Sequence, residues 1–582
     1  MLLPAFCSSR PRVVLLTAFI LVSALLLFHP SSPAASYSPA TFNSQAPYSG
    51  AGSFPIFDDD EDWVYDPSIH HAAANQTRGK RIAIIGAGAS GSSAAWFIRR
   101  AGRVIEKRLG KQEGEVLGEI VIYDKEPSIG GRTSVVYPHN DTSLRPVELG
   151  ASIFVDSNRH LVKATKRFNL KTIDPDFGET GLGIWDGTQF LYTSSISKKW
   201  YSDVYDTVSA LRRYGPLSPY RTRKAVGNLL SKFANLYHPT WLAQMGPARD
   251  VETFVERVGL GSEYTVRKGA EWATGVLGLG QKWVDEIMEG STRVNYASNM
   301  VDIHALGAAV SMATGGAKAV EGGNYRIFEE MVKESGARTR LGEEVFDILP
   351  QHQLGETPAF EVRSRILATG EEHHEGSFDQ VFYAMPWYHS SKDYGLHGLQ
   401  THAVEKVEYQ RYVHLFVTYF TTTRDRPVPS FFGLPEGVAV PNTILTSSVA
   451  AQQDSSIPPP RFQSITWHGE TKPGSGEYIV KVFSQTYLKD HFIRSMIDEE
   501  PSWLVRKEWN SYPELRPRTE WPPVEPVKGV QYLASLEPWI STMETQTLSA
   551  REAVARVVYD WWGLGYGECK GGADAWDWSC EP

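Results

Sequence analysis

The sequence of 582 residues predicts an α/β protein, with α+β character overall, built around a parallel sheet. Residues 82–85, IAII, predict a short buried strand, and a glycine-rich motif follows at 86–91. Small and apolar residues at 92–102 then predict a helix, and 119–123, EIVIY, predict a second strand. Strand, glycine loop, helix and strand in this order indicate a Rossmann-like unit that binds a dinucleotide.

Composition limits the class of protein. Hydrophobic residues make up 42% of the chain and charged residues 21%, which excludes a mostly disordered protein. With 58 basic and 67 acidic residues the formal net charge is −9, so no nucleic-acid partner is expected, because such binding depends on neutralising phosphates. Three cysteines cannot build a disulfide framework or a four-thiolate site, and no metal site is predicted.

The first 36 residues are interpreted as a targeting segment. Arg10 and Arg12 precede an apolar run at 13–28, and small residues follow at 31–36, which is the order of a secretory signal peptide. An uncleaved signal anchor is the alternative, although the run spans only about 24 Å as a helix, against a hydrocarbon core of roughly 30 Å. Either interpretation sends the rest of the chain into the secretory lumen, with membrane contact only through this segment if it is uncleaved.

Further features fit that compartment. Residues 37–79 are rich in Ser, Pro, Ala and Asn, with an acidic run, and predict a flexible linker. Two sequons predict glycosylation at Asn75 and Asn140. Cys569 and Cys580 can pair in an oxidising lumen, the alternative being two unpaired thiols on a loose tail.

The glycine motif supplies the first candidate cofactor contacts. Gly86 permits a tight turn, Gly88 lets the backbone approach a pyrophosphate, and Gly91 lets helix and strand pack closely. Ser90, inside the motif, is a further candidate. The phosphates then meet free N–H groups at the positive end of the helix dipole. A purely structural glycine turn is the alternative.

The second strand ends in Asp124, whose carboxylate can accept the ribose hydroxyls of the nucleotide. A solvated carboxylate in a turn is the alternative. Asp124 lies 33 residues after Gly91, where roughly 20 is typical. The charged stretch from Glu106 to Gly118 is therefore interpreted as an insertion in the loop between helix and strand.

A second glycine motif distinguishes between cofactors. Gly130-Gly131-Arg132 follows Asp124 six residues later, and Gly150-Ala151 follows after that. Residues 80–155 thereby resemble the FAD-binding module of the amine-oxidase-like flavoproteins. The resemblance implies FAD, with the backbone of the Gly130-Gly131 pair close to the cofactor and Arg132 reaching its phosphates.

The rest of the chain resembles a narrower family. Arg293-Val-Asn-Tyr296, then Val320-Glu-Gly-Gly-Asn324 and a late segment at 541–545, STMET, are similar to landmarks of the prenylcysteine oxidase, or prenylcysteine lyase, family. The resemblance covers nearly all of 80–563. The stretches 200–241 and 457–460 and the tail depart from it, which leaves the substrate less certain than the cofactor.

The resemblance also implies that Met543 and Glu544 begin a helix whose N-terminus points at the flavin pyrimidine, where negative charge develops on reduction. An ordinary helix start with Ser541 or Thr542 as its cap is the alternative. The pair His373-His374 is expected in an exposed charged loop, and Trp561-Trp562 in the core.

Two discontinuous domains follow from this interpretation. Strands are predicted at 412–420 and 478–483, and helices over most of 203–290. The predicted boundaries are 80–155, 318–390 and 526–563 for the FAD-binding domain, 156–317 and 391–525 for the substrate domain, and 564–582 for a C-terminal tail.

The function that the resemblance implies is thioether oxidation. The enzyme would use FAD and molecular oxygen to cleave farnesyl- or geranylgeranyl-cysteine to cysteine, a prenyl aldehyde and hydrogen peroxide, in a lysosome or vacuole or after secretion. No catalytic side chain is assigned, because the cofactor supplies the difficult step. A secreted flavin oxidase acting on amines or another metabolite is one alternative, and an FAD-fold binding protein without activity is another.

Overall fold

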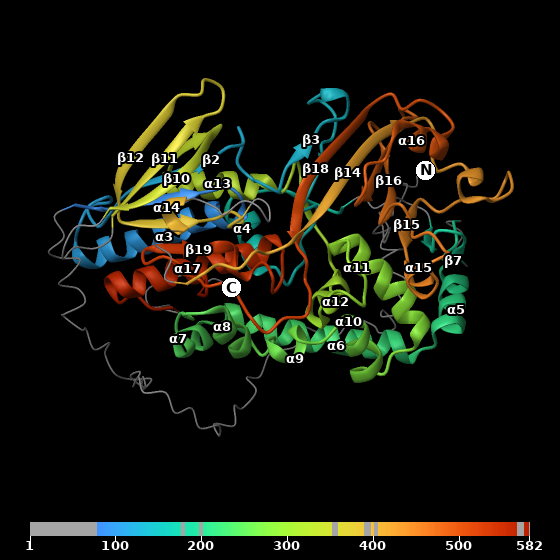
Figure 1. The fold of residues 1–582 in the computed structure, drawn as a ribbon, viewed down its shortest axis with the longest axis horizontal. Helices are drawn as coiled ribbons and strands as arrows, with labels where there is room; N and C mark the ends of the chain where they lie inside the picture. The colour runs from blue at the N-terminus through green and yellow to red at the C-terminus, as the bar shows by residue number, and fades with distance from the viewer. Residues whose placement is uncertain are drawn as a thin grey trace, which may run out of the picture.

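The structure is a computed structural model. It describes residues 78–175, 181–196, 202–351, 359–388, 397–400, 405–566 and 575–580. The targeting segment, nearly all of the linker, Asn75 and Cys569 lie outside the described residues. In Figure 1 a sheet with its covering helices and a second, smaller sheet lie on one side, and a larger sheet with a group of helices lies on the other.

The first part is built on a five-stranded parallel sheet in the order β19-β13-β1-β2-β9. Its strands are β1 (Lys80–Ile85), β2 (Leu117–Asp124), β9 (Arg338–Leu341), β13 (Gln380–Tyr383) and β19 (Val530–Tyr532). The expected strands on both sides of the first glycine motif are therefore present.

Both faces of this sheet are covered, as its apolar strands require. Ile82 and Ile84 pack with helices α3 (Ala89–Leu109), α13 (Tyr325–Ser335) and α17 (Met543–Trp562). Ala83 and Ile85 pack instead with the antiparallel sheet of β10 (Glu343–Gln351), β11 (Ala359–Ile366) and β12 (Glu372–Phe378). Alternate residues of one strand thus belong to two different cores.

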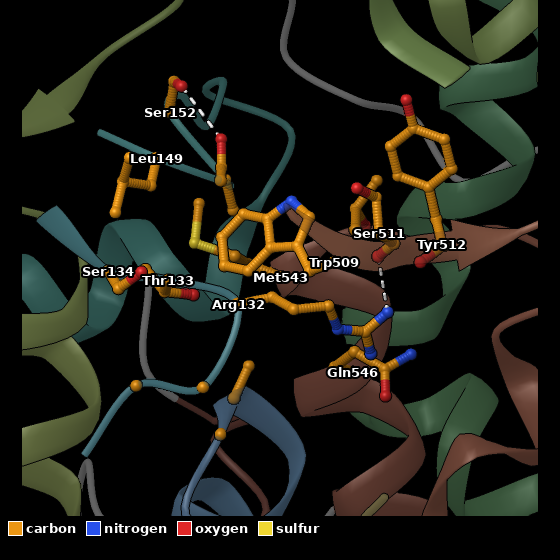
Figure 2. Close-up of a pocket in the computed structure, with 18 of the residues that line it drawn as sticks. Arg132, Thr133, Ser134, Leu149, Ser152, Trp509, Ser511, Tyr512, Met543 and Gln546 are labelled. Carbon is orange, nitrogen blue, oxygen red and sulfur yellow. Dashed lines mark hydrogen bonds between the residues drawn. The ribbon is translucent and has the colours of Figure 1, made fainter. Parts of the chain in front are cut away.

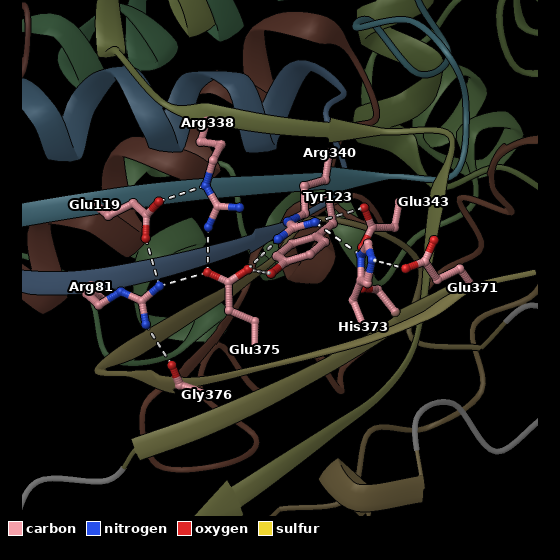
Figure 3. A network of polar contacts seen from close by, with 11 residues as sticks. Arg81, Glu119, Tyr123, Arg338, Arg340, Glu343, Glu371, His373, Glu375 and Gly376 are labelled. Carbon is pink, nitrogen blue, oxygen red and sulfur yellow. Dashed lines mark hydrogen bonds and ion pairs between the residues drawn. The ribbon is translucent and has the colours of Figure 1, made fainter. Parts of the chain in front are cut away.

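A charged network joins these two sheets (Figure 3). Glu375 on β12 accepts hydrogen bonds from Arg81, Arg338 and Arg340, at 2.8, 2.5 and 3.0 Å. His373 also lies on β12, with Nδ1 3.0 Å from a carboxylate oxygen of Glu343. The expectation of a loop at this histidine pair is therefore wrong, because the charges that suggested a loop pair across the sheet, but the expected exposure is confirmed for His374.

The second part has a seven-stranded sheet in the order β18-β14-β17-β16-β15-β6-β7, mostly antiparallel. Its strands are β6 (Leu182–Trp185), β7 (Phe190–Thr193), β14 (Tyr412–Thr422), β15 (Thr443–Thr446), β16 (Ser464–Glu470), β17 (Tyr478–Ser484) and β18 (Leu504–Pro513). The two strands expected here, at 412–420 and 478–483, are confirmed. One face packs with α16 (Asp490–Ile497) in a core of its own.

Helices complete the second part, as the sequence predicts for 203–290. They are α5 (Ser202–Tyr214), α6 (Leu217–Ala234), η2 (Asn235–Tyr237), α7 (Pro239–Met245), α8 (Val251–Val258), α9 (Ser262–Thr265), α10 (Gly269–Glu271), η3 (Trp272–Val276), η4 (Trp283–Met288), α11 (Glu289–Tyr296) and α12 (Ala305–Ser311). Shorter elements are β3 (Val135–Val136), η1 (Pro138–Asn140), β4 (Val147–Glu148), α4 (Arg159–Arg167), β5 (Thr172–Ile173), β8 (Ala319–Val320), α14 (His397–Gln400), η5 (Pro429–Phe432), α15 (Val449–Gln453) and η6 (Leu533–Leu536). Among the described helices none is long and apolar enough to cross a membrane.

The stretch from Glu106 to Gly118 is only partly a loop. Helix α3 continues to Leu109 and β2 begins at Leu117, so residues 110–116 form the connection and the two ends of the stretch belong to the helix and the strand. The Glu106 carboxylate accepts the N–H groups of Gly114, Val116 and Leu117 and holds the short connection that remains.

The described part of the C-terminal tail is not loose. Trp576 and Trp578 are each 1% exposed and pack against Trp96 and Phe97 of α3. Arg100 of the same helix donates to the Ala575 carbonyl at 2.7 Å. Cys580 is disulfide-bonded, and its pairing with Cys569 stays a prediction. Trp562 is 2% exposed, so the core assignment of the earlier tryptophan pair is confirmed for this residue.

Candidate cofactor and substrate cavity

A cavity of about 1010 Å³ is lined by residues of both parts of the molecule. It is lined by eleven of the twelve residues that the sequence nominates for the cofactor: Gly86, Gly88, Ser90, Asp124, Gly130, Gly131, Arg132, Gly150, Ala151, Met543 and Glu544. Gly91 does not line it. The two glycine motifs and the start of α17, 457 residues apart at the extremes, therefore meet at one site.

The three glycines of the first motif have different roles. A Cβ on Gly91 would lie 1.9 Å from the Gly86 carbonyl oxygen, so Gly91 lets α3 pack against the strand. Gly86 has φ +108° and needs glycine for that turn. A Cβ on Gly88 would meet only the Gly130 oxygen and the Gly131 Cα, both at 3.8 Å, which is ordinary contact. The lack of a side chain at Gly88 therefore keeps the cavity open and is not required by the fold.

The N-terminus of α3 opens on this cavity. No side chain caps the helix, and its first turn carries no acidic residue. The free N–H groups and the helix dipole are therefore left for an anionic ligand.

Asp124 lies where the second strand ends, as predicted. Its Oδ2 accepts the Ala87 N–H at 2.6 Å and its Oδ1 accepts the Glu126 N–H at 2.9 Å. Burial raises the pKa of this carboxyl group. Each oxygen retains a further lone pair for a hydroxyl of a bound nucleotide.

The second glycine motif lies against the first. The Gly130 N–H donates to the Ala87 carbonyl at 2.9 Å, and Gly88 and Gly130 form an isolated parallel bridge. Gly130 has φ +128°, and a Cβ there would lie 2.4 Å from the Thr133 oxygen. Two bare backbone segments thus border the same volume, which is the arrangement a pyrophosphate requires.

Arg132 is engaged by protein groups (Figure 2). Its guanidinium pairs with Glu537, which is 1% exposed, and donates to the Ser511 carbonyl at 2.7 Å. Tyr412 donates its hydroxyl to the other Glu537 oxygen at 2.6 Å. The phosphate contact that the resemblance implies for Arg132 stays a prediction, since these partners use both terminal nitrogens of its side chain.

Helix α17 begins at Met543 with Thr542 as its cap, and Thr545 completes a capping box. The Met543 side chain lines the cavity, as does Trp509 (Figure 2). The Glu544 carboxylate accepts the N–H groups of His160 and Leu161 and the hydroxyl of Tyr237. Burial raises the pKa of Glu544 to about 7. Glu544 thus caps α4 from the wall of the cavity.

The second part contributes residues that the sequence interpretation missed. Alternate residues of its sheet line the cavity, among them Leu415, Thr443, Leu445, Ser464, Thr466, His468, Lys481, Phe483, Lys507 and Trp509. Helices α6 and α11 add Leu229, Leu230, Phe233, Val294, Asn295 and Tyr296. A lysine inside the apolar strand Tyr478–Ser484 is a signal that could have found this face.

Lys481 is the buried cation of that face. Its Nζ donates to the Glu148 carbonyl and to the Ser152 hydroxyl, both at 3.0 Å. Burial lowers the pKa of Lys481 to about 8, so it is protonated at neutral and acidic pH. Burial raises the pKa of the nearby Glu148 to about 7.

Several buried polar atoms at the cavity wall have no hydrogen-bond partner among the described residues. Among them are Nε1 of Trp509, Oγ of Ser511 and Nε2 of Gln546. Buried donors are normally satisfied, so these atoms indicate a ligand with acceptor groups. Together with the bare glycine segments, the uncapped helix and Asp124, they fit a bound dinucleotide cofactor whose far end reaches the second part.

Comparison with known proteins places the chain. A family model described as prenylcysteine lyase matches residues 198–568, more than half of the sequence. The chain belongs to the prenylcysteine lyase family. A second model, NAD(P)-binding Rossmann-like domain, matches residues 84–168, where the dinucleotide fold was predicted. The family resemblance and the fold class read from the sequence are both confirmed.

Named relatives cover most of the chain. It is 25% identical to prenylcysteine oxidase 1 of Pongo abelii over 83% of this chain and 89% of the relative. It is also 25% identical to farnesylcysteine lyase of Arabidopsis thaliana over 82% of this chain and 87% of the relative. Among solved structures, putrescine oxidase bound to putrescine covers 82% of this chain and 99% of its own, at a TM-score of 0.48 and 13% identity.

Proposed function

We propose that the protein is an FAD-dependent thioether oxidase that cleaves prenylcysteine, the farnesyl- or geranylgeranyl-cysteine left when prenylated proteins are degraded. The observation that carries the proposal is the single cavity in which two dinucleotide-type glycine motifs face a mainly apolar chamber of the second part. Membership of the prenylcysteine lyase family and the names of the relatives support the choice of substrate.

The overall reaction converts the thioether, oxygen and water to free cysteine, a prenyl aldehyde and hydrogen peroxide. FAD, when bound, supplies the two-electron oxidation by accepting a hydride from the allylic carbon next to sulfur. Water adds to that carbon, and the carbon–sulfur bond then breaks with return of a proton to sulfur.

The residues of the chain bind and orient the reactants. Leu229, Phe233 and Leu445 give the chamber apolar walls that suit a prenyl chain and exclude water. Lys481 supplies a cation on the same wall that suits the carboxylate of the cysteine. The glycine segments and Asp124 hold the nucleotide end of the cofactor, so the reacting carbon and the cofactor are held together.

The compartment is part of the same proposal. The protein works in the lumen of the secretory pathway, in a lysosome or vacuole. The signal-like segment supports this, and so does Asn140, which is exposed at the end of η1. The disulfide at Cys580 also suits an oxidising lumen. A glycosidase-sensitive shift of the natural protein on a gel tests it, and a protein without any glycan would contradict it.

Anaerobic reduction of the bound flavin tests the reaction. The purified protein is mixed with farnesylcysteine, with its analogue saturated at the first double bond, and with a simple amine, and the loss of flavin absorbance is followed. We expect reduction by farnesylcysteine, and much slower reduction by the saturated analogue, because the double bond stabilises the positive charge that develops on the carbon.

The same measurement separates the alternatives. Equal rates for the two thioethers would contradict the allylic mechanism. Reduction by the amine alone would assign the protein to amine oxidation. A bound flavin that no compound reduces would indicate a binding protein without this activity.

A further inference from the structure

An apolar surface is exposed on helices α5 and α6, away from the cavity residues described above. Seven of the fourteen exposed large apolar side chains in the described part of the chain lie here, with exposed fractions between 37% and 66%. They are Val204, Tyr205, Val208 and Leu211 on α5, Leu217 and Tyr220 on α6, and Val276. We call this set the α5–α6 surface. Single exposed apolar residues are ordinary, but such a cluster marks an interaction site.

The segments that carry the cluster lie close together in the chain and are tied to one another by a few specific contacts. Val204, Val208 and Leu211 follow a four- and three-residue spacing that places them on one face of α5. Two residues, Gly215 and Pro216, separate α5 from α6.

Trp283 ties these helices to the segment that carries Val276. Its ring lies 5.6 Å from that of Tyr214, the last residue of α5, and its Nε1 donates to Thr222 of α6 at 3.0 Å. Arg221 of α6 donates to the Gly278 carbonyl at 2.6 Å. These contacts hold α5, α6 and the segment of Val276 together.

Cations accompany the apolar residues. Arg212, Lys224 and Lys282 are exposed and form no ion pair with any residue that the structure describes. Lys224 lies seven residues after Leu217, which places both on the same face of α6. Three cations without an ion pair among the described residues thus accompany the exposed apolar side chains.

We propose that the α5–α6 surface docks the protein on the face of an anionic lipid bilayer. Exposed aliphatic and tyrosine side chains enter the boundary between headgroups and acyl chains, and unpaired Arg and Lys side chains bind the phosphates and carboxylates of the lipids. The positive side chains of the surface complement the negative headgroups of such a bilayer. This complementarity favours a bilayer as the occupant over a protein surface, which would have to supply acidic side chains as partners.

The position of α6 gives the docking a use. The first half of α6 carries Leu217 and Tyr220, and its second half lines the cavity with Leu229 and Phe233. Nine residues of helix, about 14 Å, separate Tyr220 from Leu229, the nearest members of the two sets. A prenylated substrate that partitions into the bilayer is therefore brought near the chamber. The docking itself does not depend on the proposed reaction.

Vesicle flotation of the full protein tests the proposal. The protein is mixed with vesicles of phosphatidylcholine alone or with about a third phosphatidylserine, and the bound fraction is measured. We expect binding to the anionic vesicles, weaker by at least tenfold for Val208→Glu/Tyr220→Glu. Lys224→Gln/Arg212→Gln should lose about fivefold per charge removed. Leu367→Glu/Val438→Glu, exposed elsewhere, and Lys107→Gln/Lys166→Gln are the matched controls.

Each outcome is decisive. Absence of binding to both kinds of vesicle, or equal losses for the surface and control variants, would overturn the proposal. A change in sedimentation coefficient caused by Val208→Glu/Tyr220→Glu without vesicles would show instead that a second copy covers the surface. Flavin reduction by dissolved farnesylcysteine should be unchanged in all these variants, which keeps this test separate from that of the reaction.

Discussion

Individual side chains at the cavity are fixed by partners far away in the sequence. Arg132 comes from the second glycine motif, and its partner Glu537 lies just before α17. Glu537 compensates the free-energy cost of placing the positive charge of Arg132 at this wall. Tyr412 donates its hydroxyl to the remaining oxygen of Glu537. The shape of this wall therefore depends on three residues acting together.

We expect Glu537→Gln to lower the free energy of unfolding by about 2 kcal/mol. The value is below the 3–5 kcal/mol typical of fully buried pairs, because the Arg132 side chain is 35% exposed. Urea unfolding measures the change. Glu113→Gln, which breaks the exposed pair with Arg103, is the control and should change the free energy by less than about 1 kcal/mol.

Glu148 gives a prediction about pH. Its pKa rises from 4.5 to about 7 in the folded protein, mainly through burial. Between these values the folded state keeps a proton that the unfolded state has lost, so Glu148 makes the protein less stable as pH rises through this window. Lys481 stays protonated throughout, since its pKa is about 8.

Glu148→Gln removes that titration. Relative to the natural protein, the variant should gain on the order of 3 kcal/mol of unfolding free energy between pH 4.5 and 7. Urea unfolding at several pH values gives the difference curve. Glu408→Gln, at a side chain 72% exposed, is the control variant, and a flat difference curve for Glu148→Gln would refute the assignment.

At the scale of elements, the junction of β1, its loop and α3 separates the requirements of folding from those of binding. Gly91 is needed for packing and Gly88 for open space, although both belong to one motif. The motif itself predicts packing for Gly91 and close backbone approach for Gly88, and the space around each Cα agrees with these roles.

We expect Gly91→Ala to lower stability by about 3 kcal/mol or more, because its methyl group would overlap the Gly86 carbonyl. Gly88→Ala should fold with a change within about 1 kcal/mol but retain much less FAD, since the methyl group points into the open cradle. Thermal melting and flavin absorbance per chain measure the two effects. Full flavin content in Gly88→Ala would contradict this division of roles.

Local elements at this junction could be predicted because strand, turn and helix signals lie within about 12 residues of each other. Strands β14 and β17 were predictable for the same reason. The sheet face that carries Lys481 and Trp509 could not be predicted. Packing between distant segments decides which side of a strand meets a cavity. The length of α3 was missed because charged residues at its end suggested a loop.

At the scale of the whole molecule, the C-terminal segment joins the first part as a structural element. The glycine and aspartate residues around it form no pattern that predicts a helix or strand, but two of its tryptophans are buried against α3. The Lys163 side chain donates to the Trp578 carbonyl, so α4 holds the same segment.

We expect Trp578→Ala to destabilise the protein by about 3–5 kcal/mol, because the residue is 1% exposed and leaves a cavity between α3 and His160. Trp561→Ala, at a half-buried position of α17, should have a smaller effect. Calorimetry of both variants compares them. A change below about 1 kcal/mol for Trp578→Ala would mean that the segment is only loosely attached.

The order of strands in the parallel sheet has a consequence for biosynthesis. Strand β1 leaves the ribosome near the beginning of the chain, but β13 and β19, which extend the sheet beyond it, follow about 300 and 450 residues later. At roughly 5–20 residues per second, β1 waits about half a minute or longer for the sheet to be complete. During that time an apolar strand edge is open to aggregation, so the nascent chain should depend on chaperones more than a protein of similar size with contiguous domains.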